Sequence, residues 1–257
     1  MIRYALLGLL QGLTEFLPVS SSGHLVLART VLGVESPGAS LEAVVHLGTL
    51  CALLVYFRRD LSRLAVGLWR RGEERQSVGQ LVVGTVPVVA AGLLARGAIT
   101  RAFGAPVFVG AMLVVTALTL ALADRRVRHV GRAGREDVTA CDAVAVGVAQ
   151  AVALLPGISR SGATVAMGIG RGLHPSRAAR FSFLLAVPAI AGACILALLD
   201  TAAAPGFDVG GLALAGGCAL LSGLVAIRLL LRVVRAGILW PFAVYCAVVG
   251  LAVVVWG

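Results

Sequence analysis

The side chains best suited to chemistry lie near the start of the chain, in Gln11-Gly-Leu-Thr-Glu-Phe-Leu-Pro-Val-Ser-Ser-Ser-Gly-His24. Gln11 and Glu15 are four residues apart, so on a helix their side-chain oxygens lie on one face. Amide and carboxylate oxygens suit a hard divalent cation such as Mg²⁺ or Ca²⁺. Because ionisable residues inside apolar segments are mostly functional, this pair predicts a site rather than a structural contact between helices.

Hydroxyl groups and an imidazole follow Glu15. Pro18 cannot continue the preceding helix, and the serines after it favour a turn that restarts a helix at Ser20 or Ser21. His24 can exchange a proton near neutral pH, and it shares a helical face with Ser21. We therefore expect Ser21 to be a nucleophile and His24 its base, with Ser20 and Ser22 beside the substrate. Capping of the restarted helix is the alternative role for any one of these serines.

A second polar motif, Leu155-Pro-Gly-Ile-Ser-Arg-Ser-Gly-Ala-Thr164, interrupts an apolar stretch in the other half of the chain. A guanidinium in such a segment needs an anion, and the planar fork of Arg160 matches phosphate or carboxylate oxygens. Ser159, Ser161 and Thr164 add hydroxyl groups, and the N–H groups at the start of the second helix add further donors. The motif predicts an anion-binding pocket.

The two motifs are electrostatically complementary. A carboxylate that faces a bound phosphate repels it unless a cation lies between them, so we expect Glu15 and Gln11 to bind Mg²⁺ or Ca²⁺. The alternative is that Arg160 only neutralises the charge of Glu15 and binds no substrate.

The composition excludes an ordinary soluble domain. The chain has 257 residues, of which 59% are hydrophobic, and a mean hydropathy of +0.98. These values are typical of a multi-pass membrane protein. The net charge is +10, and all 22 basic residues are arginines that gather in short connections between apolar segments. This is the pattern of cytoplasmic loops, so we expect no nucleic-acid partner.

The apolar segments predict an all-α fold with six transmembrane helices and two re-entrant helical hairpins. The hairpins are the interrupted segments 2–32 and 138–172, whose broken backbone must be buried in protein or line a watery cavity. The six crossings are expected at 40–57, 77–95, 106–123, 178–199, 209–227 and 236–256.

The arginine-rich loops also set the expected orientation. Loops 58–75 and 124–137 carry most of the loop arginines and are placed in the cytoplasm. The first hairpin then opens to the outside and the second to the cytoplasm, with both termini outside. We expect one integral membrane domain, 1–257, made of inverted repeats at 1–123 and 138–257 and joined by the cytoplasmic linker 124–137.

A shift of 139 positions supports this repeat. It aligns Gln11 with Gln150, Ser20 with Ser159, Ser22 with Ser161 and Gly23 with Gly162. Inverted repeats with broken helices commonly form a binding site where they meet near the middle of the bilayer.

The motifs Q-G-L-T-E-F-L-P-V-S-S-S-G-H and P-G-I-S-R-S-G-A-T resemble the two signatures of the undecaprenyl-pyrophosphate phosphatases of the bacitracin-resistance type. The resemblance extends to the chain length, the helix count and F-S-F-L-L-A-V-P at 181–188. It implies a bacterial inner-membrane enzyme that removes the terminal phosphate of undecaprenyl pyrophosphate, a lipid carrier in the bilayer. This reaction recycles the carrier for peptidoglycan synthesis and competes with bacitracin for the same lipid.

The resemblance also assigns roles to individual residues. It implies that Glu15 is the metal-binding or catalytic glutamate, Ser21 the proposed nucleophile, His24 the essential histidine and Arg160 the arginine that grips phosphate. It gives supporting roles to the hydroxyls of Ser20, Ser159 and Thr164. Gln11 departs from the pattern, because many relatives carry a second glutamate there. A lower metal affinity is the expected consequence.

Two functions remain open on the sequence alone. The first is hydrolysis of the lipid pyrophosphate, and the second is transport of a lipid phosphate by a flippase that uses the same anion site. The grouping of Glu15, Ser21 and His24 favours hydrolysis, because bond cleavage needs a nucleophile and a proton carrier. A homodimer is one expected assembly, and the sequence does not fix the oligomeric state.

Overall fold

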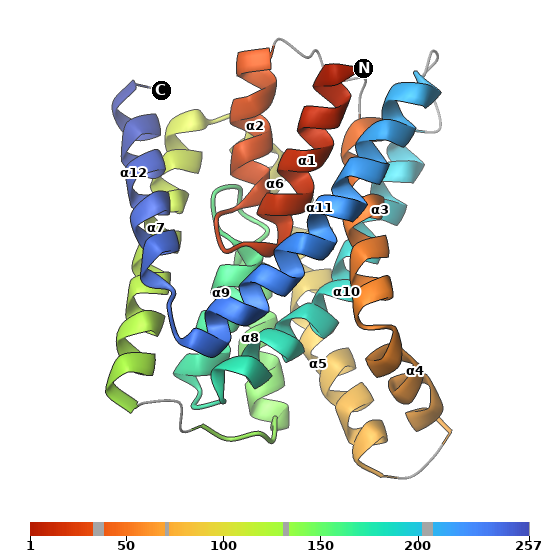
Figure 1. The fold of residues 1–257 in the computed structure, drawn as a ribbon, viewed down its shortest axis with the longest axis vertical. Coiled ribbons are helices and arrows are strands. Elements are labelled where there is room, and N and C mark those ends of the chain that lie inside the picture. The colour runs from red at the N-terminus through yellow and green to blue at the C-terminus, as the bar shows by residue number, and fades with distance from the viewer. Residues whose placement is uncertain (33–38, 70–71, 131–133, 202–207, 257) are drawn as a thin grey trace.

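The computed structural model describes residues 1–32, 39–69, 72–130, 134–201 and 208–256. Within these ranges the chain forms twelve α-helices (Figure 1). Their bounds are α1 Ile2–Phe16, α2 Ser21–Leu32, α3 Ala39–Tyr56, α4 Arg58–Gly67, α5 Glu73–Leu94, α6 Arg96–Phe103, α7 Pro106–Val130, α8 Ala140–Val152, α9 Arg160–Gly170, α10 Pro175–Thr201, α11 Val209–Ala236 and α12 Trp240–Trp256.

Several of these helices are suited to a membrane. Four of them, α5, α7, α10 and α11, are long and apolar enough to cross a bilayer. A fifth crossing results if α3 and α4, which meet at a bend of 76°, are counted as one span. The expected segment 236–256 is shorter than predicted, because α11 runs on to Ala236 and Gly237 ends it with a φ of 72°.

Three of the connections expected between the apolar segments contain helices. Helix α4 lies within 58–75, α6 lies within 96–105, and α7 continues to Val130 inside the expected linker 124–137. Arginine, leucine and alanine are good helix formers, so a run of positive charge marks a polar segment without excluding a helix.

The two interruptions predicted from the sequence are both present. Helices α1 and α2 are separated by a turn that ends at Ser20, which has a left-handed φ of 69°. Helices α8 and α9 are separated by a turn that contains Gly157, with a φ of 96°. In Figure 1 the first pair descends from the end of the molecule where α1 begins and α12 ends, and the second pair rises from the opposite end.

The two turns touch each other in the middle of the molecule. Ser161 Oγ on the second pair donates a hydrogen bond of 3.2 Å to the main-chain oxygen of Leu17 on the first. Thr116 of α7 donates to the main-chain oxygen of Gly157 at 2.9 Å and accepts from the N–H of Ser159 at 3.0 Å. Polar groups freed by the broken helices are therefore satisfied within the protein, as an apolar surrounding requires.

Helix packing repeats with the same spacing as the motifs. A Cβ atom at Gly8 would lie 2.2 Å from the main-chain oxygen of Ala215, so α1 crosses α11 in close contact. A Cβ atom at Gly147, which is 139 positions later, would lie 2.2 Å from the main-chain oxygen of Gly84, where α8 crosses α5. Such approaches need a residue without a side chain, so glycines 139 positions apart both lie at close helix crossings.

Candidate active site

Glu15 is the centre of the polar cluster at the two turns. It lies one residue before the end of α1, and only 8% of its surface is exposed. Its Oε2 accepts hydrogen bonds from Ser21 Oγ at 2.6 Å and from Gln11 Nε2 at 2.8 Å. Its Oε1 accepts a hydrogen bond from Nη2 of Arg160, the first residue of α9. One carboxylate therefore joins the two sequence motifs.

A cavity of about 270 Å³ opens beside this cluster. Its polar lining comes from both motifs and from two residues outside them: Thr14, Glu15, Ser21, Ser22, His46, Gln150, Ser159 and Arg160. A second cavity of about 310 Å³ adjoins it and is almost wholly apolar, formed by α5, α10 and Leu154. The two cavities share Val88, Leu154, Ala189 and Ala193, so an apolar space leads directly to the charged groups.

The remaining hydroxyls of the motifs mainly bind the protein itself. Ser20 Oγ lies 3.3 Å from Ser22 Oγ, and Ser159 Oγ lies 3.2 Å from Ser161 Oγ at the equivalent place in the second motif. Ser20, Ser161 and Thr164 are buried outside the cavity lining. Thr164 Oγ1 lies 2.5 Å from Ser182 Oγ on α10 and also donates to the main-chain oxygen of Arg160. Ser22 and Ser159 face the cavity.

The expected pairing of His24 with Ser21 is not found in the structure. His24 Nδ1 lies 2.8 Å from the main-chain oxygen of Ser20, and Nε2 lies 2.7 Å from the hydroxyl of Tyr245. The His24 ring also stacks on Tyr245 at a centroid distance of 5.6 Å. Because a carbonyl oxygen can only accept, Nδ1 carries the proton, and the neutral ring accepts the tyrosine hydroxyl with Nε2. His24 therefore holds the turn at Ser20, while Ser21 donates to Glu15.

His46 is a cavity residue that the sequence did not reveal. Its position four residues after Glu42 favours a structural pair within one helix. In the structure, His46 Nδ1 lies 2.8 Å from the main-chain oxygen of Glu42, and Nε2 lies 3.9 Å from Glu15 Oε2. No local spacing could show this, because α3 brings the imidazole to Glu15 only through packing of the helices.

The oxygen-rich cluster fits a hard divalent cation. Gln11 is fully buried, and its Oε1 has no hydrogen-bond partner among the described residues. Gln150, which lies 139 positions after Gln11, is 1% exposed, and both of its amide atoms lack a hydrogen-bond partner among the described residues. An unsatisfied buried amide costs about 1–3 kcal/mol, which a bound ion or water would remove. The described part of the chain holds no cluster of three His, Cys, Asp or Glu, so a cation here would also need oxygens from water or substrate.

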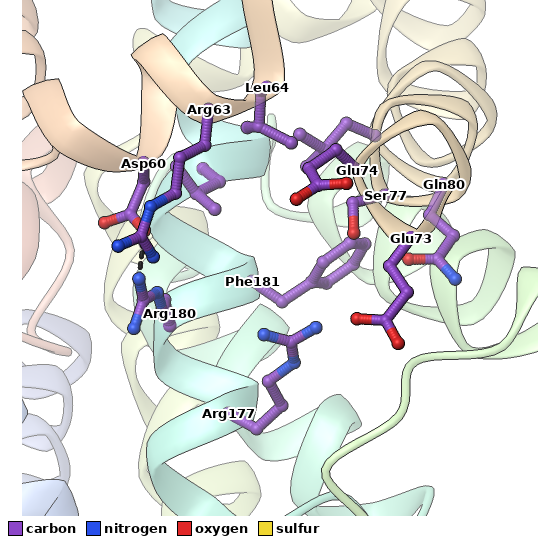
Figure 2. Close-up of a pocket in the computed structure, with 12 residues that line it drawn as sticks. Asp60, Arg63, Leu64, Glu73, Glu74, Ser77, Gln80, Arg177, Arg180 and Phe181 are labelled. Carbon is purple, nitrogen blue, oxygen red and sulfur yellow. Dashed lines mark hydrogen bonds and ion pairs between the residues drawn. The ribbon is translucent and has the colours of Figure 1, made fainter. Parts of the chain in front are cut away.

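A separate charged cavity of about 230 Å³ lies between α4, α5 and α10 (Figure 2). It is lined by three carboxylates and three guanidiniums, namely those of Asp60, Glu73, Glu74, Arg63, Arg177 and Arg180. Arg180 forms an ion pair with Asp60 across the gap between α10 and α4. The formal charges of this lining cancel, and neither motif contributes to it. Three of the catalytic candidates, Glu15, Ser21 and Arg160, line the cavity beside Glu15, whereas His24 lies outside both linings.

Comparison with known proteins places the chain in a family. The model of the bacitracin resistance protein BacA family matches residues 4–252. An undecaprenyl-diphosphatase of Syntrophotalea carbinolica is 44% identical over 250 residues, which cover 95% of this chain and 94% of the relative. Those of Desulfatibacillum aliphaticivorans and Methanosphaera stadtmanae are 40% and 35% identical, and each covers at least 95% of both chains. The motifs, the apolar helices and these full-length matches show that this chain belongs to the bacitracin resistance protein BacA family.

Proposed function

We propose that this chain hydrolyses undecaprenyl pyrophosphate to undecaprenyl phosphate and inorganic phosphate. The observation that carries the proposal is the grouping of Glu15, Ser21 and Arg160 within hydrogen-bond distance at one cavity. A hydroxyl, a carboxylate and a guanidinium are the groups that phosphoryl transfer needs for attack, proton acceptance and charge stabilisation. The relatives are named for this activity, which favours hydrolysis over transport of a lipid phosphate.

The adjoining apolar cavity supports a lipid substrate. A diphosphate held by Arg160 would have its isoprenoid chain beside Val88, Leu154 and Ala189, which line both cavities. Burial of each methylene group contributes about 0.8 kcal/mol, so a long chain gains affinity that a water-soluble diphosphate lacks. Turnover of this lipid would recycle the carrier for peptidoglycan synthesis and underlie the bacitracin resistance named in the family description.

In the proposed mechanism Ser21 Oγ attacks the terminal phosphorus in line with the bridging oxygen. A bond forms between Ser21 and phosphorus while the bond to the bridging oxygen breaks, and undecaprenyl phosphate leaves. The serine proton passes to Glu15 Oε2, which already accepts its hydrogen bond at 2.6 Å. Arg160 stabilises the charge that develops on the phosphoryl oxygens, and water then releases phosphate from the phosphoserine. Direct attack by water, with Ser21 as a donor only, is the rival route.

A divalent cation, Mg²⁺ or Ca²⁺, is proposed beside this machinery. Glu15 and Gln11 would hold it, and when bound it would offset negative charge on the substrate's phosphate oxygens. Ser22 and Ser159, which face the cavity, would donate hydrogen bonds to the same oxygens. Ser20, Ser161 and Thr164 would keep the two turns in shape behind them.

We expect Gln11→Glu to tighten activation by divalent ions by about tenfold. The amide of Gln11 lies 2.8 Å from Glu15 Oε2, so a carboxylate there would repel Glu15 unless a cation lies between them. The measurement is phosphate release against Mg²⁺ concentration. A Mg²⁺ dependence that superimposes on wild type would show that position 11 does not contact the ion.

The membrane arrangement is also proposed. The two broken helix pairs would be re-entrant hairpins of an inverted repeat, with α12 as a sixth crossing, since its 17 residues span about 25 Å. The repeated glycine crossings and paired serines support this repeat. The chain would lie in the bacterial inner membrane, with the Glu15 cavity open to the periplasm.

Cysteine labelling tests the orientation. We expect a cysteine at Gly104 to react with an impermeant reagent in intact cells, and a cysteine at Glu74 to react only after the membrane is opened. Both positions are exposed, and the native cysteines are first replaced by alanine. Labelling of the position 74 variant alone in intact cells would invert the proposed orientation.

The activity is tested by inorganic phosphate release from undecaprenyl pyrophosphate by purified protein, with and without EDTA. We expect release that EDTA abolishes and Mg²⁺ or Ca²⁺ restores. Failure to release phosphate with any added divalent ion would contradict the proposed hydrolysis. Release that is unchanged by EDTA would contradict the proposed cation.

A further inference from the structure

His46 presents to the cavity beside Glu15 a ring nitrogen, Nε2, that makes no hydrogen bond among the described residues. Its Nδ1 lies 2.8 Å from the main-chain oxygen of Glu42, and because that oxygen can only accept, Nδ1 carries the proton. In the tautomer with one ring proton, the lone pair is therefore on Nε2, which lies 3.9 Å from Glu15 Oε2. A histidine that binds a metal almost always donates its other ring N–H to a carbonyl or carboxylate in this way.

His24 provides an internal comparison. Its Nδ1 makes the same kind of hydrogen bond, to the main-chain oxygen of Ser20, but its Nε2 lies 2.7 Å from the hydroxyl of Tyr245. It also lies outside the cavity lining, whereas the His46 side chain is 29% exposed and lines the cavity. Of these two imidazoles, only that of His46 combines a free nitrogen lone pair with a carboxylate close by.

The separation of the two donor atoms suits a shared ion. With bonds of about 2.1 Å, adjacent ligands of an octahedral ion lie about 3.0 Å apart, and opposite ligands lie about 4.2 Å apart. The 3.9 Å between His46 Nε2 and Glu15 Oε2 lies between these limits. Gln11 donates to the same Glu15 oxygen through Nε2, and its buried Oε1, which lacks a partner among the described residues, is a further oxygen that a side-chain rotation could offer to an ion.

We propose that His46 Nε2 and Glu15 Oε2 are ligands of one divalent cation, with Gln11 as an oxygen ligand. This proposal rests on the proposed function only for what the bound ion does in catalysis, because binding of the ion to the protein needs no substrate. An imidazole nitrogen suits Zn²⁺ and other transition-metal ions better than Mg²⁺ and Ca²⁺, which prefer oxygen ligands. Mn²⁺ is a transition-metal ion that accepts both kinds of ligand. The site should therefore bind Mn²⁺ more tightly than Mg²⁺, and this difference in affinity should depend on His46.

The direct test is electron paramagnetic resonance of Mn²⁺ bound to the purified full chain without substrate. The free-ion signal gives the dissociation constant, and electron spin echo modulation detects a coordinated ¹⁴N nucleus. Wild type is expected to show imidazole ¹⁴N modulation, which changes to the ¹⁵N pattern when only the histidines carry ¹⁵N. This isotope experiment needs no substitution and is unaffected by any folding defect.

Substitution then identifies which histidine binds. His46→Gln should lose the nitrogen modulation and weaken Mn²⁺ binding at least tenfold, with a smaller change for Mg²⁺. His129→Gln is the matched control, because His129 also bonds through Nδ1 to the main-chain oxygen four residues earlier, at 2.9 Å, but lies exposed on α7. It should retain both the modulation and the affinity.

Two results would overturn the proposal: no nitrogen modulation in wild type, or modulation that persists in folded His46→Gln. Neither measurement involves phosphate release, so the proposed hydrolysis and the proposed His46 ligand can be refuted independently of each other. Nitrogen modulation in a protein that releases no phosphate would contradict the hydrolysis and support the ion site. Metal-dependent release without nitrogen modulation would contradict the His46 ligand and leave the hydrolysis standing.

Discussion

Replacement of Ser21 by alanine is expected to lower kcat by about 10³-fold or more. In the proposed mechanism its oxygen forms the bond to phosphorus, and no other group can supply that atom. The hydroxyl of Ser21 already donates a hydrogen bond of 2.6 Å to Glu15 Oε2, which can accept its proton. Ser21 also lines the cavity in which the substrate would bind. The measurement is kcat for phosphate release from undecaprenyl pyrophosphate at saturating substrate.

The same variant separates the covalent route from attack by water. If Ser21 only donates a hydrogen bond, its loss should cost roughly tenfold, as expected for one bond of about 1.4 kcal/mol. Ser22→Ala is the control for the loss of a single hydrogen bond to the substrate, because Ser22 lines the same cavity but its hydroxyl lies beside Ser20 Oγ rather than Glu15. A Ser21→Ala enzyme that keeps a tenth of its kcat would end the covalent proposal.

Substitution of Arg160 is also expected to have a large effect, with kcat/KM at least tenfold lower for Arg160→Lys and about 10²-fold lower for Arg160→Ala. A hydrogen bond to a charged group is worth about 1.5–3 kcal/mol, and lysine cannot offer two parallel N–H groups to a phosphate. Arg160 also holds Glu15 Oε1, so its loss would release the carboxylate that accepts from Ser21.

Arg177→Lys is a suitable control for this series. Arg177 lines the separate cavity between α4, α5 and α10, in which neither motif takes part (Figure 2). Its substitution tests whether the loss of any partly buried guanidinium lowers activity. Wild-type kcat/KM in Arg160→Lys would contradict the assigned role and show that this arginine only balances the charge of Glu15.

Local features of the fold were predictable from the sequence. The interruptions at 17–20 and 153–159 follow from proline, glycine and serine in short apolar segments, and both are present in the structure. The contact between the two motifs was also predictable, because a carboxylate in one apolar segment and an arginine in another each need a partner of opposite charge. The repeat at an offset of 139 indicated which residues of the two turns would correspond.

Features that depend on packing between distant helices were not predictable. The spacing of His24 and Ser21 predicts that they share a helical face. In the structure, however, both ring nitrogens of His24 are hydrogen-bonded elsewhere, to Tyr245 of α12 and to the main-chain oxygen of Ser20. His46 reaches Glu15 only because α3 packs against α1 and α11. The helix at Arg58–Gly67 was missed because charge reports the side of a membrane, whereas helix formation follows propensity and packing.

The most direct test of the central claim is to follow both products from undecaprenyl pyrophosphate that carries ³²P only in its terminal phosphate. The proposed function predicts that wild type releases the label as inorganic phosphate and leaves unlabelled undecaprenyl phosphate in equal amount. Glu15→Gln, which removes the carboxylate at the centre of the site, should release almost none. Label released as pyrophosphate, or label retained in the lipid by active wild-type protein, would contradict the account.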